Sequence, residues 1–234
     1  MNYLSHALGC LDDDPYVLAG TSVPDWLSVV DRKVRVPGRG AAALSDDEDP
    51  SARGVAMGVL RHLEDDRWFH ETREFAELSL RFAVELRDRL PGDEGFRPSF
   101  LGHILVEILI DATLIERDPS IAQRYYAAIA TVAPERVQAA VNRMARRPTE
   151  QLIRWINRFL ELRFLYDYLD DDKLLFRLEQ VMQRVGLPAL GNRLDSWFPA
   201  ARRVIADRCD ALLTPPPPPT ILFISDTLLP ESKS

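Results

Sequence analysis

The chain has 234 residues, of which 46% are hydrophobic, and its formal net charge is −7 at pH 7. This length and apolar content allow a full buried core, and the acidic balance argues against nucleic acid as the main partner, because a duplex binder normally presents a basic face. No apolar run approaches the twenty or so residues that a membrane span needs, and the first residues lack the basic-then-apolar plan of a secretion signal. We therefore expect a cytoplasmic protein without a membrane partner.

Hydrophobic residues recur with the period of an α-helix along nearly the whole chain, without convincing strand alternation or an internal repeat. This pattern predicts an all-α fold, a single helical bundle of about eight to nine helices over residues 1–213. Residues 214–234 are expected to form a Pro-rich extended tail, because Pro215 to Pro219 exclude helix. Helices are expected at 15–22, 52–71, 74–90, 99–117, 120–131, 134–146, 149–169, 171–186 and 189–213.

Two irregular segments are expected in the N-terminal third. Pro24 should interrupt the first helix and leave Asp25 at its end, where a carboxylate is easily aimed at a cation. Residues 33–50 are rich in glycine and acids, which predicts a mobile loop or a lid. Asp49, followed by a proline, then provides a start for the next helix.

That second helix carries a stripe of potential metal ligands. His62, Asp66 and His70 follow one another at steps of four residues, which places their side chains on one helix face. The same face also carries Val59 and Phe69. We therefore expect the three polar side chains to point into the protein.

A matching stripe lies in the helix expected at 99–117. His103, Glu107 and Asp111 are also spaced by four residues, and Ile110 lies on the same face. Two such helices facing each other would offer six nitrogen and oxygen ligands to a cation.

Inward imidazoles and carboxylates are costly to bury alone, so they need counter-charges, hydrogen-bond partners or a cation. The mixed ligand set predicts a divalent metal, with Mn or Fe favoured and Zn or Mg as further options. The alternative is that these residues only satisfy one another in the core.

Four short motifs can be compared with known families. They are Met1-Asn-Tyr-Leu-Ser-His6, Gly20-Thr-Ser-Val-Pro-Asp25-Trp26, Gly58-Val-Leu-Arg-His62-Leu-Glu-Asp-Asp66-Arg-Trp-Phe-His70 and Glu107-Ile-Leu-Ile-Asp111-Ala112. In order and internal spacing they resemble the acyl carrier protein phosphodiesterase family, distant relatives of the HD-domain metal-dependent phosphohydrolases. The resemblance covers roughly residues 1–117.

This resemblance implies an all-α, HD-domain-like hydrolase that uses Mn²⁺ or a similar ion to cut the phosphodiester joining 4′-phosphopantetheine to a serine of acyl carrier protein. Carried over by position, the functional residues are His6, Asp25, His62, Asp66 and Asp111. The chain departs from the family pattern at other positions. His70 and Glu107 stand where members carry aspartate, Ala112 replaces a histidine, and His103 adds an imidazole.

The residues suggest two metal sites. The first is expected to comprise His62, Asp66 and Asp111, with Asp25 bridging or orienting the nucleophilic water. The second is expected to comprise His70, His103 and Glu107.

The expected catalytic residues are Asp25, His6 and Asp66. His6 could be a ligand, the general acid for the leaving oxygen, or an ordinary surface or capping histidine. Glu64 and Asp65 point away from the ligand direction and are expected to be solvated.

The predicted function is therefore metal-dependent hydrolysis of a phosphoester substrate, with acyl carrier protein as a candidate partner. One alternative is a non-catalytic helical adaptor with a structural polar core. Another is a di-iron oxidative bundle, although the Glu-x-x-His pairs typical of such sites do not occur here. An apolar stretch at 220–224 must pack on its own domain or on a neighbouring subunit, so a homo-oligomer is a further option.

Overall fold

The computed structural model describes residues 1–90 and 95–216, and all regular secondary structure within these ranges is helical, which confirms the all-α class. Nine described helices of eleven or more residues correspond in order to the nine expected ranges. They are α2 (Pro15–Val30), α4 (Pro50–Glu71), α5 (Arg73–Arg89), α6 (Pro98–Arg117), α7 (Pro119–Ile129), α8 (Pro134–Met144), α9 (Leu152–Leu162), α10 (Asp171–Arg184) and α11 (Phe198–Leu212).

Four short elements were not expected from the sequence. Two are the five-residue helices α1 (Tyr3–Ala7) and α3 (Gly38–Ala42), and two are the 3-10 helices η1 (Phe164–Leu169) and η2 (Gly191–Leu194). The single helix predicted at 149–169 is instead α9 followed by η1, and the one predicted at 189–213 is instead η2 followed, after a turn, by α11. Arg163 separates α9 from η1 in a left-handed conformation with φ of 45°, which a continuous α-helix does not allow.

The prediction that Pro24 interrupts the first helix is wrong, because α2 continues through it to Val30. Proline removes only its own N–H from the helix, so the carbonyl of Gly20 loses one donor. Val23 and Trp26 are fully buried on either side of the proline, and this packing holds the helix together.

Residues 33–50 also differ from the expected mobile loop or lid. The segment contains α3, which contacts α4 and α8, and it buries Val34, Ala41 and Leu44 in the core. The predicted Pro-rich tail falls largely outside the described residues, which end at Pro216.

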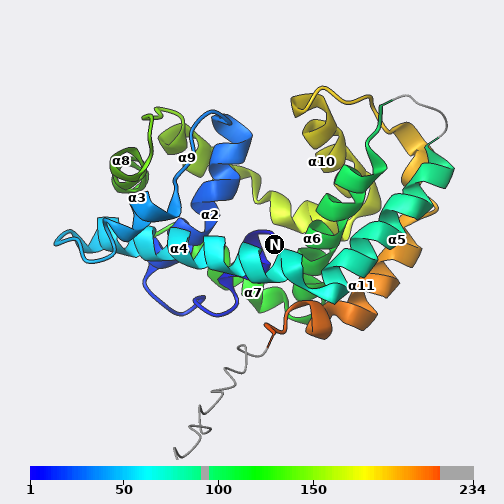
Figure 1. The fold of residues 1–234 in the computed structure, drawn as a ribbon, viewed down its shortest axis with the longest axis horizontal. Helices are drawn as coiled ribbons and strands as arrows, with labels where there is room; N and C mark the ends of the chain where they lie inside the picture. Colours follow the sequence, from blue (N-terminus) through cyan, green and yellow to red (C-terminus); the bar gives the residue numbers. More distant parts are fainter. Residues whose placement is uncertain (91–94, 217–234) are drawn as a thin grey trace, which may run out of the picture.

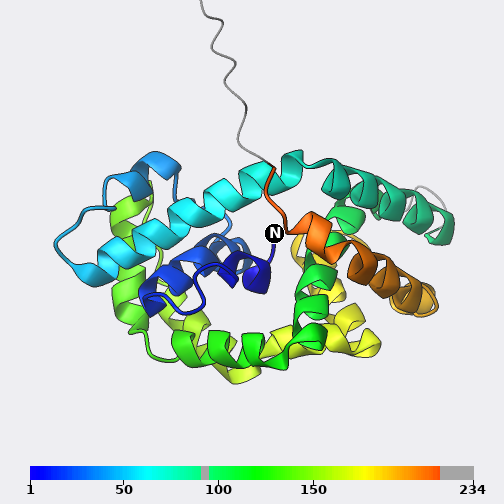
Figure 2. The same cartoon turned by 90° about the horizontal axis from the view of Figure 1, so that it is seen from below.

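The long helices surround the N-terminus (Figures 1 and 2). Helices α4 and α5 follow each other across the whole molecule, with α2, α8 and α9 toward one end and α6, α10 and α11 toward the other. The N-terminus lies near the centre in both views, between α4 and α6. This arrangement brings the two polar stripes predicted from the sequence to the middle of the protein.

Helix α6 is the one described helix whose length and composition would suffice to cross a membrane. In this fold it is a core helix, because 67% of its most apolar window is buried inside the protein. It also carries Glu107 and Asp111.

Candidate metal centre

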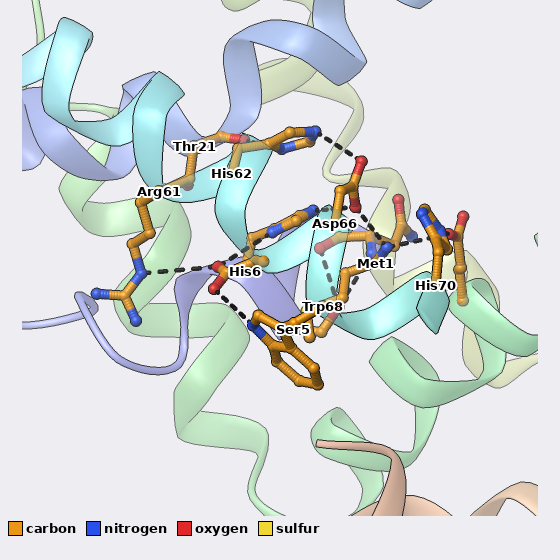
Figure 3. A network of polar contacts seen from close by, with 12 residues as sticks. Met1, Ser5, His6, Thr21, Arg61, His62, Asp66, Trp68 and His70 are labelled. Atoms are coloured by element: carbon orange, nitrogen blue, oxygen red, sulfur yellow. Dashed lines mark hydrogen bonds and ion pairs between the residues drawn. The ribbon is translucent and has the colours of Figure 1, made fainter. Parts of the chain in front are cut away.

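Side chains from α1, α2 and α4 meet at one point beside the N-terminus. One potential ligand atom each from His6, Asp25 and His62 can be chosen so that all lie within 4.8 Å of one another. Asp66 lies beside them, with Oδ1 3.3 Å from Nε2 of His6 and Oδ2 3.3 Å from Nε2 of His62 (Figure 3). We call these four residues the inner cluster.

His62 is oriented by the backbone of α2. Its Nδ1 donates a hydrogen bond of 2.7 Å to the carbonyl oxygen of Thr21. A carbonyl only accepts, so Nδ1 carries the hydrogen and the lone pair of Nε2 faces Asp66. A histidine that binds a metal commonly makes this kind of contact through its other ring nitrogen.

The contact with Thr21 depends on a close approach of two helices. A Cβ atom on Gly58 would lie 2.7 Å from the Cα of Gly20 and would overlap the carbonyl oxygen of Val17. Only glycine fits at such a crossing. The two glycines therefore allow α2 and α4 to pack closely enough for His62 to reach the backbone of α2.

His6 is oriented in the same way by a carboxylate. Its Nδ1 lies 3.3 Å from Oδ2 of Asp65 in hydrogen-bonding geometry, and its ring stacks on that of His62 with 3.9 Å between centroids. The side chain of His6 is fully buried, and its Nε2 has no aligned hydrogen-bond partner among the described residues although Asp66 is near. Both imidazoles thus point Nε2 toward the same place.

Asp111 does not belong to the inner cluster but binds the backbone of the helix that carries His6. Its Oδ2 accepts a hydrogen bond of 2.9 Å from the backbone N–H of Leu4, and its Oδ1 accepts one of 2.9 Å from that of Ser5. These N–H groups belong to the first turn of α1, where they have no partner within the helix. Asp111, expected as a ligand of the first metal, therefore caps α1 and positions His6.

Asp25 is the least compensated carboxyl group of the inner cluster. Its Oδ2 is buried and has no hydrogen-bond partner among the described residues. Burial raises the pKa of Asp25 to about 7, although His62 acts in the opposite direction. This carboxylate needs a nearby positive charge to stay ionised at neutral pH.

Asp66 has the opposite electrostatic character. Burial alone would raise its pKa, but contacts with His6, His62 and the N-terminal ammonium group hold the pKa well below its ordinary value. Asp66 is therefore ionised at neutral pH and is a ready oxygen ligand.

A second group of potential ligands lies one turn further along α4 and on α6. Nε2 of His70 is 2.9 Å from Oε1 of Glu107, and Nε2 of His103 is 3.3 Å from the same oxygen. Their ligand atoms also lie within 4.8 Å of one another. We call these three residues the outer cluster, because 33% of the His70 side chain and 42% of the His103 side chain are exposed.

The α-ammonium group of Met1 joins the two clusters. It lies 2.8 Å from Oδ1 of Asp66 and 3.0 Å from Oε1 of Glu107. Burial would lower the pKa of this amine, but Glu107 and Asp66 outweigh burial and raise it. The two carboxylates of facing helices thus share one buried positive charge.

The structure therefore brings together most of the residues expected at a metal centre. The side chains of the expected second set, His70, His103 and Glu107, lie together. The first set differs, because His6 takes the place expected for Asp111.

Sequence reasoning also missed Asp65, which was expected to be solvated. Only 17% of its side chain is exposed, and it contacts His6, Arg61 and Trp68. Glu64, also expected to be solvated, is indeed exposed and pairs with Arg67. The burial of Asp65 could have been predicted only from its contact with His6. The position of His6 depends in turn on the short helix α1.

The inner cluster has a donor set suited to a divalent cation. It offers two imidazole Nε2 atoms, each oriented through Nδ1, and carboxylate oxygens from Asp25 and Asp66. Mixed nitrogen and oxygen ligands suit Mn, Fe and Zn better than they suit Ca. Among the described residues Oδ2 of Asp25 has no hydrogen-bond partner and Nε2 of His6 has only the 3.3 Å contact with Asp66, so these are the atoms that such an ion would satisfy.

Comparison with known proteins does not extend this description, because the chain matches no protein-family model, no curated protein and no solved structure.

Proposed function

We propose that the protein is a divalent-metal-dependent phosphoester hydrolase whose inner cluster holds the ion. The observation that supports this proposal is the buried Oδ2 of Asp25, which has no hydrogen-bond partner among the described residues, beside two imidazoles whose Nε2 atoms face Asp66. A polar core that served only packing would satisfy its own members, since each unpaired buried group costs about 1–3 kcal/mol.

The ligands would be His6, His62, Asp66 and Asp25. A bound divalent ion supplies charge neutralisation on a phosphoester and lowers the pKa of a water toward about 7. Asp65 and the carbonyl of Thr21 keep both imidazoles in the tautomer that presents Nε2. His6 therefore acts as a ligand and not as the general acid, because its Nδ1 is engaged and its Nε2 is enclosed.

Asp25 is the proposed ligand that depends most on the ion. Burial raises its pKa to about 7 in the metal-free chain, so a bound cation would displace a proton from this carboxylate near neutral pH. It also lines a pocket of about 210 Å³ that reaches Glu107 of the outer cluster. A substrate that enters this pocket would therefore meet carboxylates of both clusters.

Phosphoester turnover tests this proposal. The full chain would be stripped with chelator, reloaded with Mn²⁺ and assayed on an aryl phosphate monoester, an aryl phosphate diester and holo-acyl carrier protein. We expect turnover of at least one class, its loss on chelation, and its loss in His62→Gln and Asp25→Asn.

Glu64→Gln is the matched control, because Glu64 lies on the same helix but is exposed and outside the cluster. It should retain activity. A folded chain that binds Mn²⁺ but hydrolyses none of the three would contradict the proposed function. A folded chain that binds no metal and hydrolyses none would instead favour the non-catalytic adaptor.

A further inference from the structure

The pocket beside the metal centre is lined by groups of both charges. Asp25 and Glu107, which belong to the two ligand clusters, contribute carboxylates. Helix α10 contributes the guanidinium groups of Arg177 and Arg184. A molecule that fills this pocket therefore meets both potential metal ligands and cationic side chains.

Arg177 and Arg184, the two arginines that line the pocket, differ in which groups neutralise their charge. Arg177 donates from Nε, at 2.8 Å, and from a terminal nitrogen to Oδ2 of Asp167, so its charge is already paired. The guanidinium group of Arg184 has no hydrogen bond or ion pair among the described residues. Arg184 is the cation of this pocket that is free to bind a ligand.

The surroundings of Arg184 favour an anion. Burial lowers the pKa of its guanidinium group, the hydroxyls of Tyr3 and Tyr168 act weakly against this, and Arg32 adds a second positive charge nearby. Arg32 donates a hydrogen bond of 2.8 Å to the backbone carbonyl of Arg184, which places Arg32 at the C-terminal end of α10. Arg184 remains exposed to solvent, so an oxyanion can reach its guanidinium group and pair with it through charge-assisted hydrogen bonds.

The pocket lining is also aromatic and presents a further donor. Tyr3, Trp155, Phe164 and Tyr168 line the pocket. The buried Nε1 of Trp155 has no acceptor among the described residues. Aromatic walls with a few unpaired donors suit a flat or apolar organic group that carries acceptor atoms.

We propose that this pocket selects phosphoesters whose organic part carries a second anionic group, and that Arg184 binds that group. The inference rests on the proposed function, because the scissile phosphoester would lie beside the inner cluster. The substrate would thus be a phosphorylated compound with a carboxylate or a second phosphate at its far end. Both are oxyanions that a guanidinium group recognises through paired N–H groups.

Binding of phosphonates tests the proposal without any turnover, because their carbon–phosphorus bond is not hydrolysed. The Mn²⁺-loaded full chain would be titrated calorimetrically with phenylphosphonate, phosphonobenzoate and phenylenebisphosphonate, the last two as meta and para isomers. We expect at least one doubly anionic probe to bind about tenfold tighter than phenylphosphonate, which corresponds to one charge-assisted contact. The carboxylate and phosphonate probes distinguish the two kinds of second group.

Arg184→Ala should remove this preference and leave the affinity for phenylphosphonate unchanged, while Arg184→Lys should retain part of it. Arg147→Ala is the matched control, since Arg147 is exposed in the turn after α8 and has the same charge. It should keep the full preference. Equal melting temperatures of the variants would show that the fold is intact.

Equal affinity for singly and doubly anionic probes, or a preference that survives in Arg184→Ala, would overturn the proposal. These results are distinguishable from failure of the proposed function. Turnover without the preference would support the hydrolase and contradict the role of Arg184. The preference without turnover would support the anion-binding pocket and contradict the hydrolase.

Discussion

Nδ1 of His62 lies 2.7 Å from the carbonyl oxygen of Thr21, on a helix packed across its own. This contact couples the close crossing of α2 and α4 to the orientation of a proposed metal ligand. The crossing exists because Gly20 and Gly58 let the two backbones touch. The two glycines, the packing of α2 on α4 and the orientation of the proposed ligand His62 therefore depend on one another through this hydrogen bond.

Gly58→Ala should separate α2 from α4, because the new Cβ would overlap the carbonyl oxygen of Val17. We expect a loss of about 1–3 kcal/mol in the free energy of unfolding, as for other overpacked sites, and weaker Mn²⁺ binding. Urea unfolding and calorimetric Mn²⁺ titration measure the two effects. Gly38→Ala is the control, because a Cβ there meets only the Leu63 side chain at 3.7 Å. A Gly58→Ala protein of native stability would refute the close crossing.

Asp65→Asn should weaken Mn²⁺ binding by about 10–100-fold, the usual effect of removing a partner that orients a ligand histidine. The amide can still accept a hydrogen bond from Nδ1 of His6, so the fold should persist while the charge is lost. Calorimetric titration measures this change. Glu64→Gln, which removes the neighbouring charge on the exposed face, should change the affinity little. Equal effects of the two substitutions would mean that Asp65 does not orient His6.

Asp111→Asn should destabilise the protein by about 1–3 kcal/mol, because one buried backbone N–H of α1 would face an amide N–H₂ group instead of an oxygen. The stoichiometry of Mn²⁺ at saturation should stay the same, since Asp111 is not among the proposed ligands. Chemical unfolding and metal analysis of the same sample separate the two roles. Loss of metal from a chain of unchanged stability would restore Asp111 as a ligand.

Mn²⁺ affinity should rise with pH through about 7, because the ion competes with a proton on Asp25, whose pKa burial raises to about 7. Titrations between about pH 5.5 and 8 measure this slope, and it should be shallower in Asp25→Asn. A native chain whose affinity does not change with pH would contradict this role of Asp25.

In the metal-free chain the same pKa shift has the opposite consequence for stability. The pKa of Asp25 is higher in the folded chain than in the unfolded chain. Its contribution to the free energy of unfolding is therefore complete below about pH 4 and is lost as the pH rises through about 7. Asp25→Asn should therefore stabilise the chelated protein at about pH 8, by about 2–4 kcal/mol. Urea unfolding in chelator gives the difference. A less stable Asp25→Asn protein under these conditions would show that Asp25 is already compensated without an ion.

The convergence of the two polar stripes was predictable, because helical period alone places His62 and Asp66 on an apolar face and does the same for Glu107. The shared contact of Asp66 and Glu107 with the Met1 ammonium group shows that these faces meet. Helix starts were also predictable where the chemistry is local. Asp49, for example, caps α4 by accepting a hydrogen bond from the N–H of Ser51.

The remaining features depend on tertiary contacts that no local pattern encodes. Helix α1 has only five residues, too few for a periodic signal, so neither the place of His6 nor its contact with Asp65 could be predicted. The role of Asp111 as a cap follows from the same short helix. Helix α2 continues through Pro24 because packing outweighs one lost hydrogen bond, which is a tertiary effect.

Equilibrium binding of Mn²⁺ to the folded, chelator-stripped full chain tests the central claim most directly. We predict at least one tightly bound equivalent that is lost in His6→Gln and His62→Gln and retained in His103→Gln, whose side chain belongs to the half-exposed outer cluster. A folded native chain that binds no divalent metal, or one that loses its metal only in His103→Gln, would contradict the assignment of the inner cluster.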